Sequence, residues 1–242
     1  MDTTILQQLT GEFFGTVILI YIGNSVVAGN VLNKTKSFNT GWLHITLGWG
    51  LAVTMAIYSV GWLSPAHLNP AVTLGMAVAG QIEWILVIPY IVVQILGGFL
   101  GAVLVWIHYY PHFKETENEE AILSVFSTAP AISRKRWNLI SETFATGFLV
   151  YALLAFTQGE FTEGLNPVIV GLLILTIGLS LGGTTGYAIN PARDLGPRIA
   201  HQLMPIANKG QSNWEYSWIP VLGPFIGSII GGIGFLIVTS IG

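Results

Sequence analysis

The sequence contains no cysteine, and only 9% of its 242 residues are Asp, Glu, Lys or Arg. The absence of cysteine excludes disulfides, thiol nucleophiles and cysteine-ligated metals, but it leaves the cellular compartment open. A soluble globular domain carries about 25% charged residues, so this chain lacks the polar surface that keeps such domains in water. The net charge of -3 is small, and no basic face indicates nucleic-acid binding. No nucleophile–base set or metal-ligating cluster is recognisable, so we expect no enzyme, no metal and no cofactor.

The chain is instead rich in long apolar runs: 52% of its residues are hydrophobic, and it contains 29 glycines. A helix needs about 20 mostly apolar residues to cross ~30 Å of hydrocarbon. The first apolar run has neither the basic flank nor the small-residue cleavage site of a signal peptide, so we expect it to remain as a span. The six predicted spans are 10–32, 41–63, 83–109, 138–157, 165–183 and 215–241.

Two further apolar segments, 66–80 and 187–204, are too short to cross, and each contains the triplet Asn-Pro-Ala, at Asn69 and Asn190. Asn is a favoured helix N-cap and Pro is favoured at the first helical position. A single copy of the triplet would therefore indicate only a helix start. Two copies, each opening a half-length apolar segment, predict two re-entrant half-helices whose preceding backbone lines a water-filled cavity.

The two triplets belong to an internal duplication. When Asn69 is aligned with Asn190, Gly50-Leu51 aligns with Gly171-Leu172. Because each copy holds three spans, an odd number, the second copy must cross the membrane in the opposite direction. We therefore predict an all-α membrane protein in which six transmembrane helices and two half-helices form one domain, 1–242, from inverted repeats of about 1–120 and 121–242.

The irregular backbone before each triplet is expected to present its carbonyl oxygens to the lumen as a ladder of acceptors. This ladder comprises Pro65, Ala66, His67 and Leu68 in the first copy and Gly186, Tyr187, Ala188 and Ile189 in the second.

The duplicated halves, the paired Asn-Pro-Ala boxes and Arg193 directly after the second box resemble the aquaporin superfamily over nearly the whole chain. The stretches MAIYSVGWLSPAHLNPAVTLG and GYAINPARDLGPR are similar to its glycerol-facilitator (aquaglyceroporin) branch. The resemblance implies an aquaporin-like fold and a passive channel for glycerol and other small uncharged solutes, which also conducts water and excludes ions and protons. It further implies a multi-pass homotetramer in the lipid bilayer of the plasma (inner) membrane, with both termini in the cytoplasm.

The same resemblance implies a selectivity filter made of Trp49, Gly178, Tyr187 and Arg193. Arg193 would offer hydrogen-bond donors, the two aromatic rings would face a solute's carbon atoms, and Gly178 would leave room for the solute. Taken alone, the aromatic residues fit an interfacial belt and Gly178 fits helix packing. A charge within an apolar segment, as at Arg193, is functional by default.

Further positions match the polyol branch, although Asp194 and Arg198 can pair at i,i+4 whatever the solute. These positions are Tyr109, Asp194, Arg198, Pro220 and Val221. Two departures from the branch, Pro65 in place of a glycine and Tyr187 in place of a phenylalanine, bear on the solute range. A main preference for water, or for neutral small organic acids such as lactic acid, is therefore an alternative.

Glu12 and Glu142 occupy matching positions within the first and fourth spans. The resemblance implies that they accept hydrogen bonds from the re-entrant loops, whereas a proton-coupled transporter would use them as titrating sites. The loop charges predict the opposite membrane orientation. The lysines and arginines outside the half-helices fall on one face, which the positive-inside rule assigns to the cytoplasm. We follow the resemblance, which places that face outside. The charged run 114–120 is expected to be a solvated loop.

Overall fold

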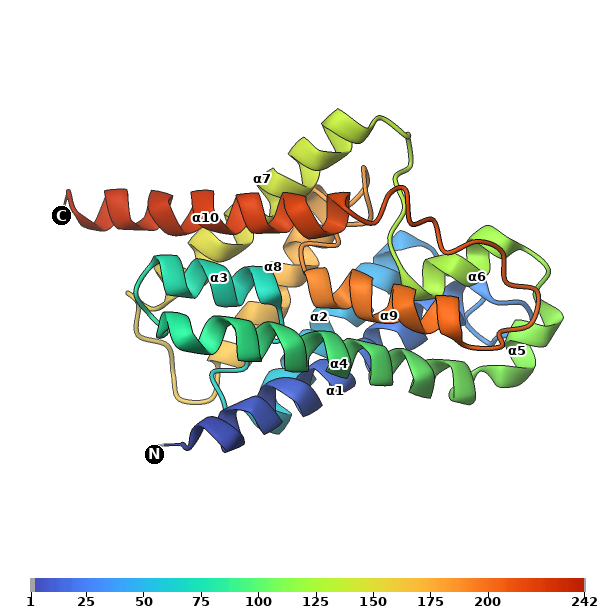
Figure 1. The fold of residues 1–242 in the computed structure, drawn as a ribbon, viewed down its shortest axis with the longest axis horizontal. Helices are drawn as coiled ribbons and strands as arrows, with labels where there is room; N and C mark the ends of the chain where they lie inside the picture. The colour runs from blue at the N-terminus through green and yellow to red at the C-terminus, as the bar shows by residue number, and fades with distance from the viewer. Residues whose placement is uncertain (1–2, 242) are drawn as a thin grey trace.

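The computed structural model describes residues 3–241, and the limits of the predicted domain, 1 and 242, lie outside this range. Within it the chain forms helices, turns and loops without a β-strand (Figure 1). The helices are α1 Ile5–Val31, α2 Trp42–Val60, α3 Pro70–Val78, α4 Trp84–His108, α5 Tyr110–Glu115, α6 Glu119–Phe126, α7 Lys135–Phe156, α8 Asn166–Ser180, α9 Pro191–Leu203 and α10 Ile219–Thr239.

Five helices of the described range, α1, α2, α4, α7 and α10, are long and apolar enough to cross a membrane. The remaining predicted span, the fifth in chain order at 165–183, forms the shorter helix α8, whose 15 residues are about 22 Å long at 1.5 Å per residue. Pro167 stands in its first turn, and a run of turns at 181–185 follows its end. Proline has no backbone N–H group, so in this first turn it costs the helix no hydrogen bond.

The charged run 114–120 was wrongly predicted to be a loop, because helices occupy both of its ends. Helix α6 begins after Asn118, whose side chain accepts a hydrogen bond from the Ala121 amide at 3.1 Å. Glu119 and Glu120 then lie in the first turn, where negative charge is favourable at a helix N-terminus. The glutamates are exposed to solvent, as expected.

The half-helices α3 and α9 lie almost in line in Figure 1, with their starts meeting near the middle of the molecule. Helix α3 packs mainly against α10 and α4, and α9 packs mainly against α4. The start of α1 and the end of α10 lie at one end of the molecule, while α5 and α6 lie at the opposite end.

Close helix packing depends on glycines at the α7–α10 contact, the most extensive between any two helices of the described range. A methyl group on Gly227 would lie 2.2 Å from the Thr143 carbonyl oxygen, and one on Gly231 would lie 2.5 Å from the Gly147 carbonyl oxygen. Backbone atoms cannot move aside as a flexible side chain can. Small residues therefore set the distance between these helices, as they do in other membrane proteins.

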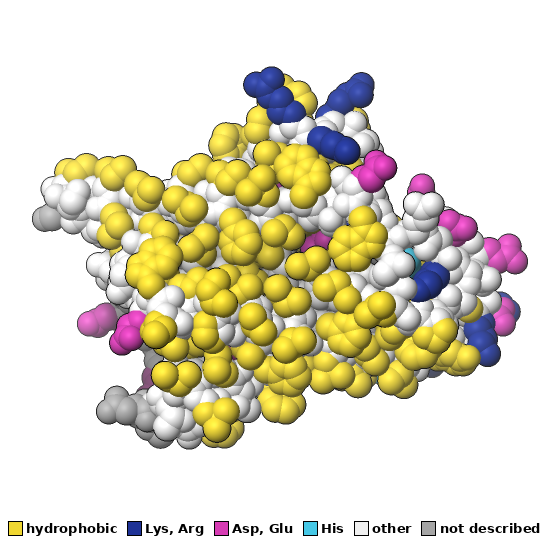
Figure 2. All heavy atoms as spheres, viewed as in Figure 1, with side chains coloured by type: hydrophobic (Ala, Val, Ile, Leu, Met, Phe, Trp, Pro, Cys, Tyr) yellow, Lys and Arg dark blue, Asp and Glu magenta, His cyan; other side chains and the backbone are white. Residues whose placement is uncertain are grey.

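The outer surface of the helices is hydrophobic across the middle of the molecule, and its charged side chains gather at the edges (Figure 2). On α4, for example, Ile85, Ile88, Val92 and Leu96 are all about half exposed or more. A contiguous apolar surface of this extent does not occur on soluble monomers, and it suits contact with lipid. The chain is an integral membrane protein.

Replacing Gly227 with alanine should push α10 away from α7, because the new methyl group meets backbone oxygen rather than a movable side chain. We expect a loss of about 1–3 kcal/mol in stability, typical of overpacking a tight contact. Thermal unfolding of the purified protein in detergent measures it. Gly234→Ala on the same helix is the matched control, since its methyl group would have no atom closer than 3.8 Å. Equal unfolding temperatures for the two variants would contradict the packing role.

Candidate functional site: the central cavity

A cavity of about 640 Å³ runs between the helices, and both re-entrant loops contribute to its wall. Trp49, Tyr187 and Arg193 are among the residues that line it, and the loop 161–164 lines it near the end of the molecule where α1 begins. The apolar part of the wall comes from α1, α2, α3, α7 and α8, with Leu19, Val53, Ile57, Val72, Met76, Leu149, Leu153, Val170 and Ile174. The wall thus combines residues of the two re-entrant loops with apolar side chains of the helices.

The two asparagines of the triplets hold the loops together across the middle of the cavity. The side-chain oxygen of Asn69 accepts the Ala71 amide at 2.9 Å, and its Nδ2 donates to the Ile189 carbonyl at 2.8 Å. Asn190 does the same in reverse, because its oxygen accepts the Ala192 amide at 3.0 Å and its Nδ2 donates to the Leu68 carbonyl at 2.8 Å. A side-chain amide has two N–H donors, so each asparagine keeps one for a molecule in the cavity.

The loop backbone before each asparagine is strained in the same alternating pattern. Ala66 and Leu68 both have φ of +52°, and Tyr187 and Ile189 have φ of +38° and +43°. Non-glycine residues rarely adopt this left-handed region, at a cost of about 1–3 kcal/mol each. Such strain persists only where surrounding contacts fix the backbone, so the loops need strong hydrogen-bond partners.

Glu12 provides these partners for the first loop. Its carboxylate accepts the backbone N–H groups of His67 at 2.8 Å and Leu68 at 2.7 Å. It also accepts the Ser64 hydroxyl at 3.0 Å and the Gln94 side-chain amide at 2.8 Å. The side chain is fully buried. Every contact made by this carboxylate uses it as a hydrogen-bond acceptor.

Glu142 has the equivalent place in the second loop, as the aligned sequence positions predict. It accepts the Ala188 and Ile189 backbone N–H groups at 3.0 and 2.9 Å, and the Thr185 hydroxyl at 2.6 Å. It too is fully buried. Hydrogen bonds to a charged acceptor are about twice as strong as neutral ones, which is what the strained loop requires.

Three of the four predicted filter residues lie at the cavity wall. The Arg193 guanidinium lies over the Trp49 ring, 4.3 Å from its centre, which is a cation–π contact. One Arg193 nitrogen, Nη1, and the Tyr187 hydroxyl are buried without a partner among the described residues. Gly178 does not line the cavity, because the Tyr187 ring covers it: a methyl group on Gly178 would lie 2.8 Å from Tyr187 Cζ.

Seven of the eight predicted ladder residues line the cavity. Gly186 lies outside it, with φ of +79° and its Cα facing the Thr128 side chain. The His67 ring lies with its Nδ1 3.2 Å from the Thr73 hydroxyl and packs beside the Tyr90 ring. The cavity wall thus takes residues from both loops.

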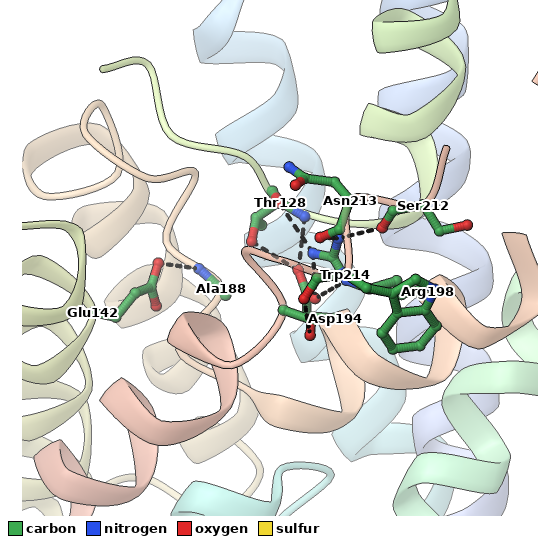
Figure 3. A network of polar contacts seen from close by, with 9 residues as sticks. Thr128, Glu142, Ala188, Asp194, Arg198, Ser212, Asn213 and Trp214 are labelled. Atoms are coloured by element: carbon green, nitrogen blue, oxygen red, sulfur yellow. Dashed lines mark hydrogen bonds and ion pairs between the residues drawn. The ribbon is translucent and has the colours of Figure 1, made fainter. Parts of the chain in front are cut away.

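Asp194 and Arg198 form a fully buried ion pair on α9, with 2.7 Å between Oδ1 and Nη2, as their i,i+4 spacing predicts. Figure 3 shows that this pair ties two distant loops to the half-helix. Asp194 accepts the backbone N–H and the hydroxyl of Thr128, both at 2.8 Å. Arg198 donates to the carbonyls of Ser212 at 2.7 Å and Asn213 at 3.0 Å.

All the N–H groups of the Arg198 guanidinium are used, since Nε and Nη2 bond Asp194, Nη2 also bonds the Thr128 carbonyl, and Nη1 makes the two loop contacts. These loop partners could not be predicted from the sequence. Most of them are backbone carbonyls, which every residue type carries. The sequence predicted only that the oppositely charged Asp194 and Arg198, one helical turn apart, can pair.

The other branch positions lie away from the cavity. Tyr109 ends α4 and packs its ring against His108 and His112. Pro220 is buried in the first turn of α10, and Val221 beside it is partly buried. None of the three lines the cavity.

Glu142→Gln should destabilise the second loop, because one carboxylate oxygen becomes an NH₂ group facing backbone N–H donors. Leaving buried donors unsatisfied costs about 1–3 kcal/mol. Thermal unfolding in detergent measures the loss. Glu83→Gln is the control, since Glu83 is exposed and makes no side-chain bond to the helix that it precedes. An unchanged unfolding temperature for Glu142→Gln would show that the carboxylate does not hold the loop.

Asp194→Asn should be more harmful, because it leaves the Arg198 charge buried without its counter-ion. Breaking one side of a buried pair costs about 3–5 kcal/mol. The exposed pair Lys34–Glu115, in which a hydrogen bond from the Lys34 ammonium lowers the pKa of Glu115, supplies the control. Glu115→Gln should leave the unfolding temperature unchanged, because exposed pairs contribute little. Similar losses in both variants would rule out a special role for the buried pair.

Comparison with known proteins places this fold and cavity in a family. The family model described as "Major intrinsic protein" matches residues 1–235. The chain is 60% identical to "Glycerol uptake facilitator protein 3" of Lactiplantibacillus plantarum over 97% of this chain and 98% of that protein. It is 41% identical to the "D/L-lactic acid transporter" of the same organism, over 93% and 94% of the two chains.

Among solved structures, the aquaglyceroporin from Plasmodium falciparum superimposes with a TM-score of 0.84 at 28% identity, over 96% of both chains. The fold is therefore aquaporin-like, as predicted. The paired half-helices, the full-length family match and this structural likeness agree, and the chain belongs to the major intrinsic protein family, in its glycerol-facilitator branch.

Proposed function

We propose that this protein is a passive channel for glycerol and other small uncharged solutes, which also conducts water and excludes ions and protons. The observation that carries the proposal is the cavity wall, which is lined by both re-entrant loops with the polar residues Asn69, Asn190 and Arg193, and by apolar residues of five helices. A polyol can turn its hydroxyl groups toward the polar residues and its carbon atoms toward the apolar ones. The name of the relative with 60% identity supports glycerol as the solute.

The narrow point of the channel, in this proposal, is the part of the wall made by Trp49, Tyr187 and Arg193. The Trp49 and Tyr187 rings offer apolar contact, and the unpartnered Arg193 nitrogen offers a donor to a solute oxygen. Gly178 acts behind this wall, as the place over which the Tyr187 ring lies.

Cation exclusion follows from the two half-helices, whose N-termini meet in the cavity. Each N-terminus is equivalent to about half a positive charge. At ~5 Å and an effective dielectric constant of ~20, each would repel a monovalent cation by about 1.7 kcal/mol. Arg193 adds a full positive charge at the wall. The remaining N–H groups of Asn69 and Asn190 would both donate to a central water oxygen, which disfavours a continuous proton wire.

Lactic acid in its neutral form is the second candidate, because a relative with 41% identity is named a D/L-lactic acid transporter. The cavity chemistry suits it, since the undissociated acid also has hydroxyl oxygens and a short carbon chain. A proton-coupled mechanism is less well supported. Glu12 and Glu142 are each engaged by at least three hydrogen-bond donors and line no part of the cavity.

The proposal extends to assembly and orientation. We place the chain in the plasma (inner) membrane as a homotetramer with one pore per subunit, built from inverted repeats, with its termini in the cytoplasm. The exposed apolar surface of Figure 2 offers area for both lipid and neighbouring subunits. In this orientation α5, which contains Lys114, and α6 face outward, together with Lys34, which pairs with Glu115 of α5.

Proteoliposomes should take up glycerol rapidly in stopped-flow light scattering, without any ion gradient, while sucrose remains excluded. Gly178→His should slow glycerol uptake strongly, because an imidazole cannot share the space that the Tyr187 ring occupies. Gly183→His is the matched control, because an added Cβ at Gly183 would meet no atom within 4 Å and its φ is not positive. Rapid water flux without glycerol uptake would assign the protein to water, and uptake of lactic acid alone, rising at low pH, would favour the second candidate.

A further inference from the structure

The Tyr187 ring rests on a platform of two glycines at the end of α8. A methyl group on Gly178 would lie 2.8 Å from Tyr187 Cζ, and one on Gly182 would lie 2.5 Å from Tyr187 Cδ1. Real Cβ atoms do not approach other atoms so closely, so the ring occupies the space that two absent side chains leave. Tyr187 needs such a fixed seat, because its own backbone has a strained φ of +38°.

Trp42, the first residue of α2, closes the side of this seat. Its ring meets the Tyr187 ring edge to face, with 5.7 Å between the centres and 81° between the planes. Its indole N–H donates to the Gly178 carbonyl at 3.0 Å, which fixes the indole against the platform. A methyl group on Gly182 would also lie 2.9 Å from the Trp42 ring, so all these groups are in contact. Edge-to-face aromatic pairs are more favourable than area burial alone would make them.

Neither Trp42 nor Gly182 lines the cavity, whereas Tyr187 does. We propose that Trp42 and Gly182 are positioning residues that hold the Tyr187 ring back from the lumen and thereby set the largest solute that passes. This inference rests on the proposed channel function and adds to it the residues that control the size limit. The channel width at this point then depends on groups outside the pore.

The two residues should act in opposite directions. Removing the Trp42 ring leaves space beside Tyr187 into which its ring can lean, which widens the lumen. Adding a methyl group at Gly182 forces the Tyr187 ring out of its seat and toward the lumen, which narrows it. A general loss of folded protein would instead lower the flux of every solute in parallel.

The experiment measures the permeability of proteoliposomes to water, urea, glycerol and the four-carbon polyol erythritol, in Trp42→Ala and Gly182→Ala. Trp42→Ala should raise the erythritol-to-glycerol ratio, and Gly182→Ala should lower the glycerol-to-water ratio about tenfold, the lower range of what one methylene changes in a tight pocket. Trp84→Ala, at an exposed tryptophan of α4, and Gly183→Ala, where a methyl group meets no atom within 4 Å, are the matched controls. Both controls should keep the wild-type ratios.

Unchanged ratios in Trp42→Ala and Gly182→Ala, or parallel losses for all solutes, would overturn the proposal. Failure of the channel function itself shows separately, as a wild-type protein that does not pass glycerol. In that case the urea-to-water permeability ratio still tests whether Trp42 and Gly182 position the Tyr187 ring. A double-mutant cycle of Trp42→Ala with Tyr187→Leu, measured by thermal unfolding in detergent, is a second test. Coupling between the two substitutions supports the proposal that Trp42 positions the Tyr187 ring, and additive effects reject it.

Discussion

The carboxylates of Glu12 and Glu142 and the amides of Asn69 and Asn190 support a backbone that could not hold its shape alone. Four non-glycine residues in left-handed conformations, placed in matching pairs in two loops, would revert to ordinary conformations without external partners. Each loop receives a buried carboxylate from one side and the opposite asparagine from the other. The cavity exists because these hydrogen bonds outweigh the strain.

In this arrangement the carboxylates and the asparagine amides bind different parts of the loops. The carboxylates use their oxygens on backbone N–H groups of the loops, while residues of the same loops line the cavity. The asparagine oxygens cap the half-helices, and one N–H of each amide crosses to the other loop. What remains for a passing molecule is a small set of acceptors and donors at fixed positions, which is how channel proteins select solutes.

The sequence predicted much of the fold because a membrane leaves few options. Apolar runs of sufficient length must be helices, and duplicated Asn-Pro-Ala triplets in short segments must begin half-helices. The five longer helices and both half-helices appear where these rules place them. The errors lie outside the membrane rules: the charged run 114–120 is helical at both ends, since a cap at Asn118 and a favourable first turn suffice in water.

By itself, the sequence determined which side chains are chemically available: two carboxylates at equivalent places, two capping asparagines, one arginine after the second triplet and one charge pair on α9. It could not decide which of them share a wall. Gly178 illustrates this, because its lack of a side chain was read as room for a solute, whereas in the structure the Tyr187 ring takes that room. Likewise, the loop carbonyls that bind Arg198 carry no residue-specific signal. Contacts between a ring and a platform, or between a guanidinium and backbone oxygens, depend on the packing of segments far apart in the chain, and only the tertiary structure fixes that packing.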